Sequence, residues 1–94
     1  MTMVEFKLET DAAPCGASYW PDSDPSNIKT LVFNNGVCKE PMEPDLYVIF
    51  WIFYGAGSTL KLTASAGGAV LKVFTDEMKH GNTCERDTGW LLVP

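Results

Sequence analysis

Three cysteines and a single histidine are the residues of this chain best suited to chemistry. His80 and Cys84 are four positions apart, a spacing that brings two side chains to one face of a helix. With Cys15 and Cys38 they would make up the ligand set of a Cys₃His zinc site. Structural zinc sites take most of their ligands in close pairs, and only one such pair is present. We therefore expect no metal site, and we interpret the cysteines as reduced, structural thiols.

The same residues allow two other kinds of chemistry. Cys84 or Cys38 could act as a nucleophile with His80 as its base, but neither cysteine lies in a recognisable nucleophile turn and no orienting third group stands out. If the protein is exported, any two of the three cysteines could form a disulfide. The sequence names no catalytic residue, so an enzyme that uses Cys84 and His80 remains only an alternative.

Carboxylates offer a second set of candidates. Residues 22–27, Asp-Ser-Asp-Pro-Ser-Asn, carry oxygen ligands at alternate positions, as calcium loops do at their start. They lack the central glycine and the distal glutamate of such a loop, and these residue types commonly bond their own backbone in turns. Asp76–Glu77 and Glu85–Asp87 could provide paired carboxylates for acid–base work. No phosphate-binding glycine motif is present, and we expect no cofactor.

The charge of the chain limits its partners. The net charge is −5, which argues against binding a nucleic-acid backbone or an anionic membrane. The acidic excess lies before residue 47, where eight acidic residues accompany three lysines. This half provides a solvated surface or a face for a basic protein partner. Residues 1–9 lack the pattern of a secretory signal, and the most apolar run, 46–54, is much shorter than a membrane-spanning helix. We expect a soluble, cytoplasmic protein, unless an exported precursor has been trimmed.

Apolar residues alternate with polar ones in a way that is typical of strands. Val4, Phe6 and Leu8 alternate with charged residues, which indicates a half-buried strand. Asn34-Asn35-Gly36 is a hairpin signal after the apolar run 28–33. Most of 10–27 is rich in turn formers and predicts a loop. Further elements are expected over these ranges: short strands at 18–20 and 90–93, a three-stranded antiparallel meander of 46–54, 59–64 and 69–75, and one helical turn over 76–80.

These elements, in a chain of 94 residues, predict a single domain over 1–94. The expected class is all-β, as a small antiparallel β-sandwich or flattened β-barrel with at most one short helix. The alternative is an α+β roll. Strand order is left open by the pattern.

Strand 46–54 is unusual because both of its faces are apolar, and the sequence does not decide which face is buried. In strand 69–75, an outward Lys72 would place Val70 and Phe74 outside and Leu71 and Val73 in the core. An exposed apolar patch then results, unless another layer covers it. The expected interface or ligand-binding residues are Trp51, Phe53, Val70 and Phe74 on the strands and Tyr19 and Trp20 on the preceding loop.

We therefore expect a non-enzymatic binding or interaction protein that forms a homodimer through its aromatic strand. One alternative is a protein that binds a small apolar or aromatic ligand between Tyr19, Trp20 and Trp51.

Overall fold

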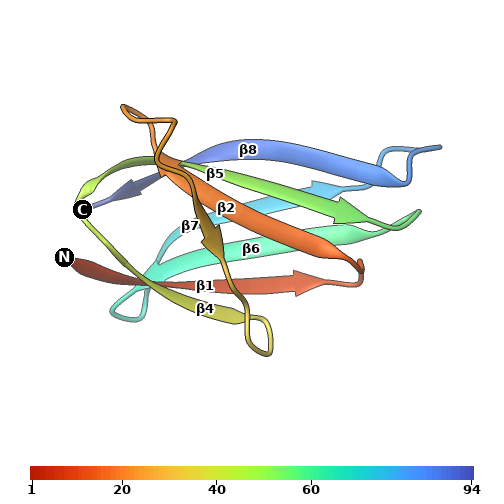
Figure 1. The fold of residues 1–94 in the computed structure, drawn as a ribbon. Helices are drawn as coiled ribbons and strands as arrows, with labels where there is room; N and C mark the ends of the chain where they lie inside the picture. Colours follow the sequence, from red (N-terminus) through yellow and green to blue (C-terminus); the bar gives the residue numbers. More distant parts are fainter.

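The fold is built from eight β-strands and no helix, and the computed structural model describes all 94 residues. The strands form two antiparallel four-stranded sheets: a first sheet in the order β4-β1-β6-β7 and a second in the order β3-β2-β5-β8. The sheets lie over each other as two layers (Figure 1), which confirms the predicted sandwich; the layers do not close into a barrel. The strands are β1 (Thr2–Thr10), β2 (Cys15–Pro21), β3 (Lys29–Leu31), β4 (Val37–Met42), β5 (Asp45–Tyr54), β6 (Thr59–Ala66), β7 (Ala69–Glu77) and β8 (Cys84–Val93).

The core forms where the inner faces of the two sheets meet. Alternate side chains of a strand point to opposite faces, so every second residue of the long strands enters this layer. Phe6 on β1, Ile49 and Phe53 on β5, and Leu62 on β6 are fully buried there. The predicted alternation of Val4 and Phe6 with charged residues is confirmed.

The predicted three-stranded meander is correct only in its second half. β6 and β7 form an antiparallel hairpin, but β5 belongs to the other sheet. The chain crosses between the sheets at Gly55–Ser58, where Gly55 has a φ of 126°. A Cβ at Gly55 would lie 2.7 Å from Oγ of Ser58, so this crossing requires glycine. A glycine-rich turn therefore marked the end of β5 without identifying its partner strand.

The turn at Asn34–Gly36 is present, but it does not join two paired strands. Asn35 and Gly36 have φ values of 52° and 78°, and a single bridge pairs Asn34 with Val37. Beyond it the chain diverges, because β3 pairs with β2 whereas β4 pairs with β1. The turn thus passes from one sheet to the other.

The expected helical turn over 76–80 is wrong. β7 continues to Glu77, and the N–H of Met78 donates to the carbonyl of Ser58 at 2.8 Å, which keeps this segment extended. The short strand expected at 18–20 is confirmed but longer, since β2 runs over Cys15–Pro21, and the last strand begins at Cys84, well before 90. The structure has no helix with the length and apolar character needed to cross a membrane.

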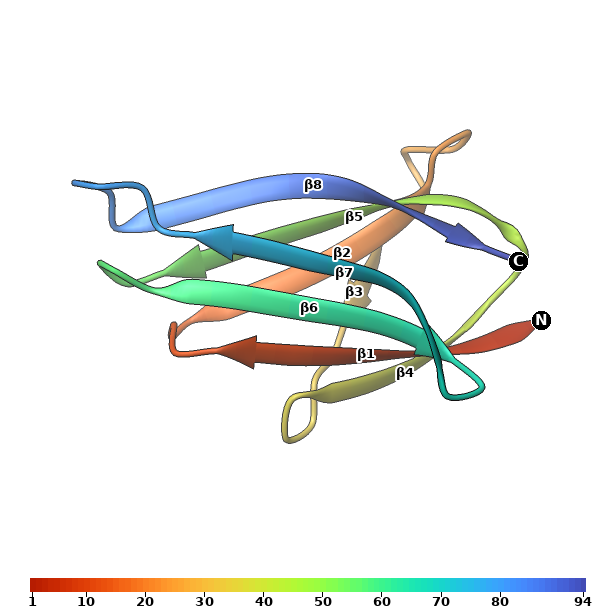
Figure 2. The same cartoon turned by 180° about the vertical axis from the view of Figure 1, so that it is seen from behind.

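The edge strands β7 and β8 face each other across one side of the sandwich (Figure 2). No backbone ladder joins them, and side chains close this side instead. Nε1 of Trp51 donates to Oδ2 of Asp76 at 2.9 Å, and Nζ of Lys79 lies 2.7 Å from Oε2 of Glu85 and 3.6 Å from Oδ1 of Asp76. These contacts connect the two sheets.

Candidate interaction surface

The outer faces of the two sheets differ sharply in polarity. The first sheet presents Glu5, Lys7 and Glu9 from β1 beside Lys61 and Thr63 from β6. Met3, Val70 and Val73 are also exposed on this face, but charged and polar residues separate them. Nζ of Lys7 lies 3.7 Å from Oε1 of Glu9. An antiparallel sheet normally has one solvated face of this kind and one face that packs on the core.

The outer face of the second sheet is mainly apolar. Its strand register places side chains in rows that cross β2, β5 and β8. We call this surface the apolar face, and define it by one residue from β2, five from β5 and two from β8: Trp20, Leu46, Val48, Phe50, Ile52, Tyr54, Trp90 and Leu92. The rows are Leu46–Leu92, Trp20–Val48–Trp90, Ser18–Phe50–Thr88, Gly16–Ile52–Arg86 and Tyr54–Cys84.

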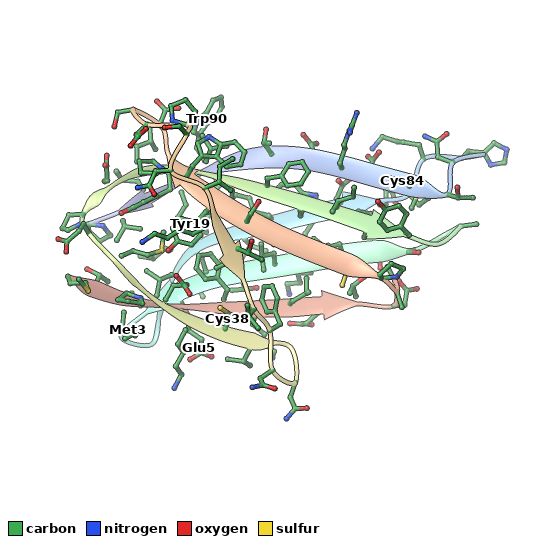
Figure 3. All side chains as sticks on the ribbon, viewed as in Figure 1. Met3, Glu5, Tyr19, Cys38, Cys84 and Trp90 are labelled. Atoms are coloured by element: carbon green, nitrogen blue, oxygen red, sulfur yellow. The ribbon has the colours of Figure 1, made fainter.

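Several of these side chains are open to solvent. Trp90 is 64% exposed and Leu92 67%, whereas Val48 and Phe50 are half-buried between their neighbours. The rings of Trp20 and Phe50 lie 6.5 Å apart, centroid to centroid. Trp90 projects from the opposite side of the molecule to Met3 and Glu5 of the first sheet (Figure 3). A continuous apolar area on a protein surface commonly marks an interface.

Most residues that the sequence predicted for an interface are in the core. Trp51, Phe53 and Tyr19 are buried, because the structure turns these faces of β5 and β2 inward. Trp20 alone among the six lies on the apolar face. Val70 is exposed, but it pairs with Ser65 at the tip of a hairpin of the first sheet.

The expected orientation of β7 is correct for Val70, which is exposed, and for Leu71, which packs against the core, but it is wrong for Val73 and Phe74. Phe74 is 5% exposed and Val73 is 43% exposed, the reverse of the prediction. Phe74 pairs with Leu62, whose side chain is fully buried, so the register of the hairpin points Phe74 into the core. Its ring lies 5.4 Å from that of Trp51. The prediction assumed that Lys72 points outward, but Lys72 pairs with the buried Ala64 on the core side of β7 and is exposed there because β7 is an edge strand.

The proposed ligand pocket between Tyr19, Trp20 and Trp51 does not form, since neighbouring residues on β2 point to opposite faces. A cavity of about 420 Å³ instead lies at one end of the sandwich, lined in part by Tyr19, Lys29 and Tyr47. The hydroxyl of Tyr19 donates to Oε2 of Glu40 at 2.6 Å. Burial first, and then this hydrogen bond, raise the pKa of Tyr19.

The cysteines and the histidine are scattered. No group of three histidine, cysteine or acidic side chains is close enough to hold a metal. All three cysteines are free thiols: Cys15 is half-buried, Cys38 is buried with its pKa raised mainly by desolvation, and Cys84 is exposed. His80 lies in the exposed β7–β8 loop, and no hydrogen bond joins it to Cys84.

The candidate carboxylates have structural partners. Oδ1 of Asp24 accepts from the hydroxyl of Ser26 at 2.8 Å, and the N–H of Asn27 donates to the carbonyl of Asp24, so residues 22–27 form turns. Asp76 and Glu85 both contact Lys79. These carboxylates make hydrogen bonds and ion pairs that stabilise the loops.

Sequence reasoning missed the contribution of β8 to the apolar face. Trp90 and Leu92 lie in a short apolar run, 90–93, that resembles 46–54 in having two apolar faces. That shared property was the available signal, but it could not show that the two segments pair. Comparisons with protein-family models, curated proteins and solved structures found no match to this chain.

Proposed function

We propose that this chain is a non-enzymatic interaction protein that self-associates through the apolar face of its second sheet. The observation that supports it is the contrast between the two outer faces of the sandwich. Glu5, Lys7 and Lys61 make one face a solvated surface, whereas Trp90 and Leu92 leave large apolar side chains in water on the other. Covering those side chains is favourable, at about 25 cal/mol per Å² of apolar area removed from water.

The size of the apolar face suits a dimer. Strands are about 4.8 Å apart and rise about 3.4 Å per residue, so the three strands that carry the apolar face, of 7, 10 and 10 residues, give a flat footprint on the order of 450 Å². The accessible area is larger because the side chains project. A standard interface buries about 800 Å² on each partner, and sheets pack face to face in many proteins.

Sedimentation velocity of the purified protein over a range of concentrations tests this proposal. We expect a dimer for the natural chain and a monomer for Leu92→Asp, because an unpaired carboxylate within an apolar interface should weaken association on the order of 100-fold or more. Leu92 is mostly exposed, so the variant should fold normally, which circular dichroism checks.

Met3→Asp provides the matched control. Met3 is 55% exposed on the outer face of the first sheet, so the change has the same chemistry on the other side of the molecule. This variant should remain dimeric. A natural chain that stays monomeric up to about 1 mM, where even a 1 mM dissociation constant gives a visible dimer, would overturn the proposal.

The cavity beside Tyr19 and Tyr47 favours a second candidate function, the binding of a small aromatic or apolar ligand. Its volume of about 420 Å³ falls within the range of small-molecule sites. The two tyrosine rings lie 5.7 Å apart and nearly perpendicular, and they line the cavity together with Lys29, Glu43 and Asp45.

Two-dimensional NMR with a panel of aromatic compounds tests this second function. Binding should shift the signals of Tyr19 and Tyr47 and leave those of Trp90 unchanged. If the compounds shift only the signals of residues on the apolar face, the cavity is not the ligand site.

A further inference from the structure

The apolar face carries opposite charges at its two ends. Arg86 is paired with Ile52 at one end and makes no ion pair within the chain. Asp22 lies at the other end, where its N–H donates to the carbonyl of Leu46 at 2.9 Å, and it also makes no ion pair. The face is therefore apolar in the middle, with one arginine at one end and Asp22 at the other. Glu85 and Asp87 flank Arg86 on β8, but they alternate to the core side, opposite Phe53 and Trp51.

The two ends are well separated. Arg86 and Leu92 are six residues apart on β8, which corresponds to about 20 Å. Asp24 and Asp45 add to the acidic end, and the loop after β2 that carries Asp22 and Asp24 rises from the second sheet there (Figure 1). At this distance the opposite charges cannot neutralise each other within one copy.

We propose that the occupant of the apolar face is a second copy in an antiparallel, face-to-face arrangement that places Arg86 of each copy over the acidic end of the other. The inference rests on the proposed function and adds the orientation of the partner. The twofold axis lies between the two sheets and runs across the strands at the level of Ile49. The row of Ile52 and Arg86 then lies over the row of Leu46 and Leu92 of the other copy.

Charge selects this arrangement over its alternatives. A twofold axis parallel to the strands would bring Asp22 near its own counterpart, and like charges facing each other oppose association. Edge-to-edge pairing of two β8 strands would leave Val48, Phe50 and Trp90 in water. Only the antiparallel arrangement both covers the apolar residues and brings each Arg86 to the end of the other copy that carries Asp22.

A mixing experiment with two charge-reversed variants tests the orientation. Arg86→Glu places acid against acid at both contacts of its own dimer, and Asp22→Lys places base against base. Each variant alone should associate on the order of 10-fold more weakly than the natural chain. Mixed in equal amounts, they should form a heterodimer nearly as tight as the natural dimer, since every contact is again between opposite charges.

Lys61→Glu and Glu5→Lys serve as controls, because they change the net charge equally on the outer face of the first sheet. These two variants should behave like the natural chain, both alone and mixed. If the natural chain dimerises and Leu92→Asp prevents it, but Arg86→Glu and Asp22→Lys alone each associate as tightly as the natural chain, the orientation is overturned and the proposed function stands. A natural chain that is always monomeric overturns both.

A spin label on Cys84 gives an independent measurement. Cys84 is exposed and pairs with Tyr54, beyond Arg86 at the basic end. When labelled protein is mixed with unlabelled ¹⁵N protein, the label should broaden the amide signals of Asp22 and Leu46 at the acidic end of the other copy. Broadening confined to the end that contains Gly16 and Tyr54 would overturn the proposed orientation.

Discussion

Trp51 on β5 donates an indole hydrogen bond to Oδ2 of Asp76 on β7, at 2.9 Å. The two residues belong to different sheets, so this bond crosses the side of the sandwich where no backbone ladder exists. The Asp76 side chain is only 7% exposed, and it also contacts the ammonium group of Lys79 at 3.6 Å. The bond therefore couples the open edges of the two layers.

We expect Asp76→Ala to lower the free energy of unfolding by about 2–3 kcal/mol, because it removes a charged acceptor and leaves a buried indole N–H unpaired. Urea denaturation followed by circular dichroism measures the loss. Asp87→Ala is the control, since Asp87 is exposed and its side chain accepts only from the N–H of Thr88. Equal losses in the free energy of unfolding for the two variants would show that the bond to Trp51 does not contribute to stability beyond what an exposed aspartate contributes.

Gly89 should resist substitution for steric reasons. A Cβ at this position would lie 2.6 Å from Cε1 and 2.7 Å from Cδ1 of Phe74, inside van der Waals contact. We expect Gly89→Ala to lower the free energy of unfolding by about 1–3 kcal/mol, as overpacking does. Adding Phe74→Leu should remove part of the clash, so that the double variant loses less than the sum of the two single losses.

Gly16→Ala provides the comparison for Gly89→Ala. Gly16 is also a strand glycine, but it lies on the outer face opposite Ile52, and a Cβ at this position would have no atom within 4 Å. We expect little change or a small gain, because alanine limits the unfolded chain more than glycine does. A destabilisation equal to that of Gly89→Ala would indicate a general intolerance of alanine, without a specific clash.

Stability should fall at alkaline pH. Burial is the largest cause that raises the pKa of Tyr19, Tyr47 and Cys38 in the folded state. The folded protein thus keeps protons that the unfolded chain loses above about pH 9–10, and each such group lowers the free energy of unfolding by up to about 1.4 kcal/mol per pH unit. Below that range their contribution is fully present and pH-independent.

Chemical denaturation from pH 7 to pH 11 measures this dependence. Tyr19→Phe should be less stable at pH 7, because Glu40 loses its phenol donor, but its stability should decline less steeply at high pH. An identical alkaline slope in the natural chain and the variant would contradict a role for Tyr19.

The three thiols should differ in reactivity with a disulfide reagent under native conditions. Cys84 is exposed and should react first, Cys15 is half-buried and should follow, and Cys38 is buried with a raised pKa and should react only as the protein unfolds. Peptide mapping by mass spectrometry assigns each modification. Early reaction of Cys38 would mean that the edge formed by β3 and β4 opens readily.

The local features of the fold could be predicted because they depend on neighbouring residues. Val4 and Phe6 alternate with charged residues, and this period of two fixes both the strand and its buried face. Glycine turns marked the ends of the strands, and the β6–β7 hairpin followed from its short connection. The all-β sandwich class was therefore accessible from pattern alone.

The candidate surface required the tertiary structure. The sequence determined that 46–54 and 90–93 each have two apolar faces, because that property belongs to the residues themselves. It could not determine that Val48 stands between Trp20 and Trp90, since strand pairing joins segments far apart in the chain. The pairing, and the position of the first sheet over Trp51, decided which apolar face was buried and which stayed in solvent.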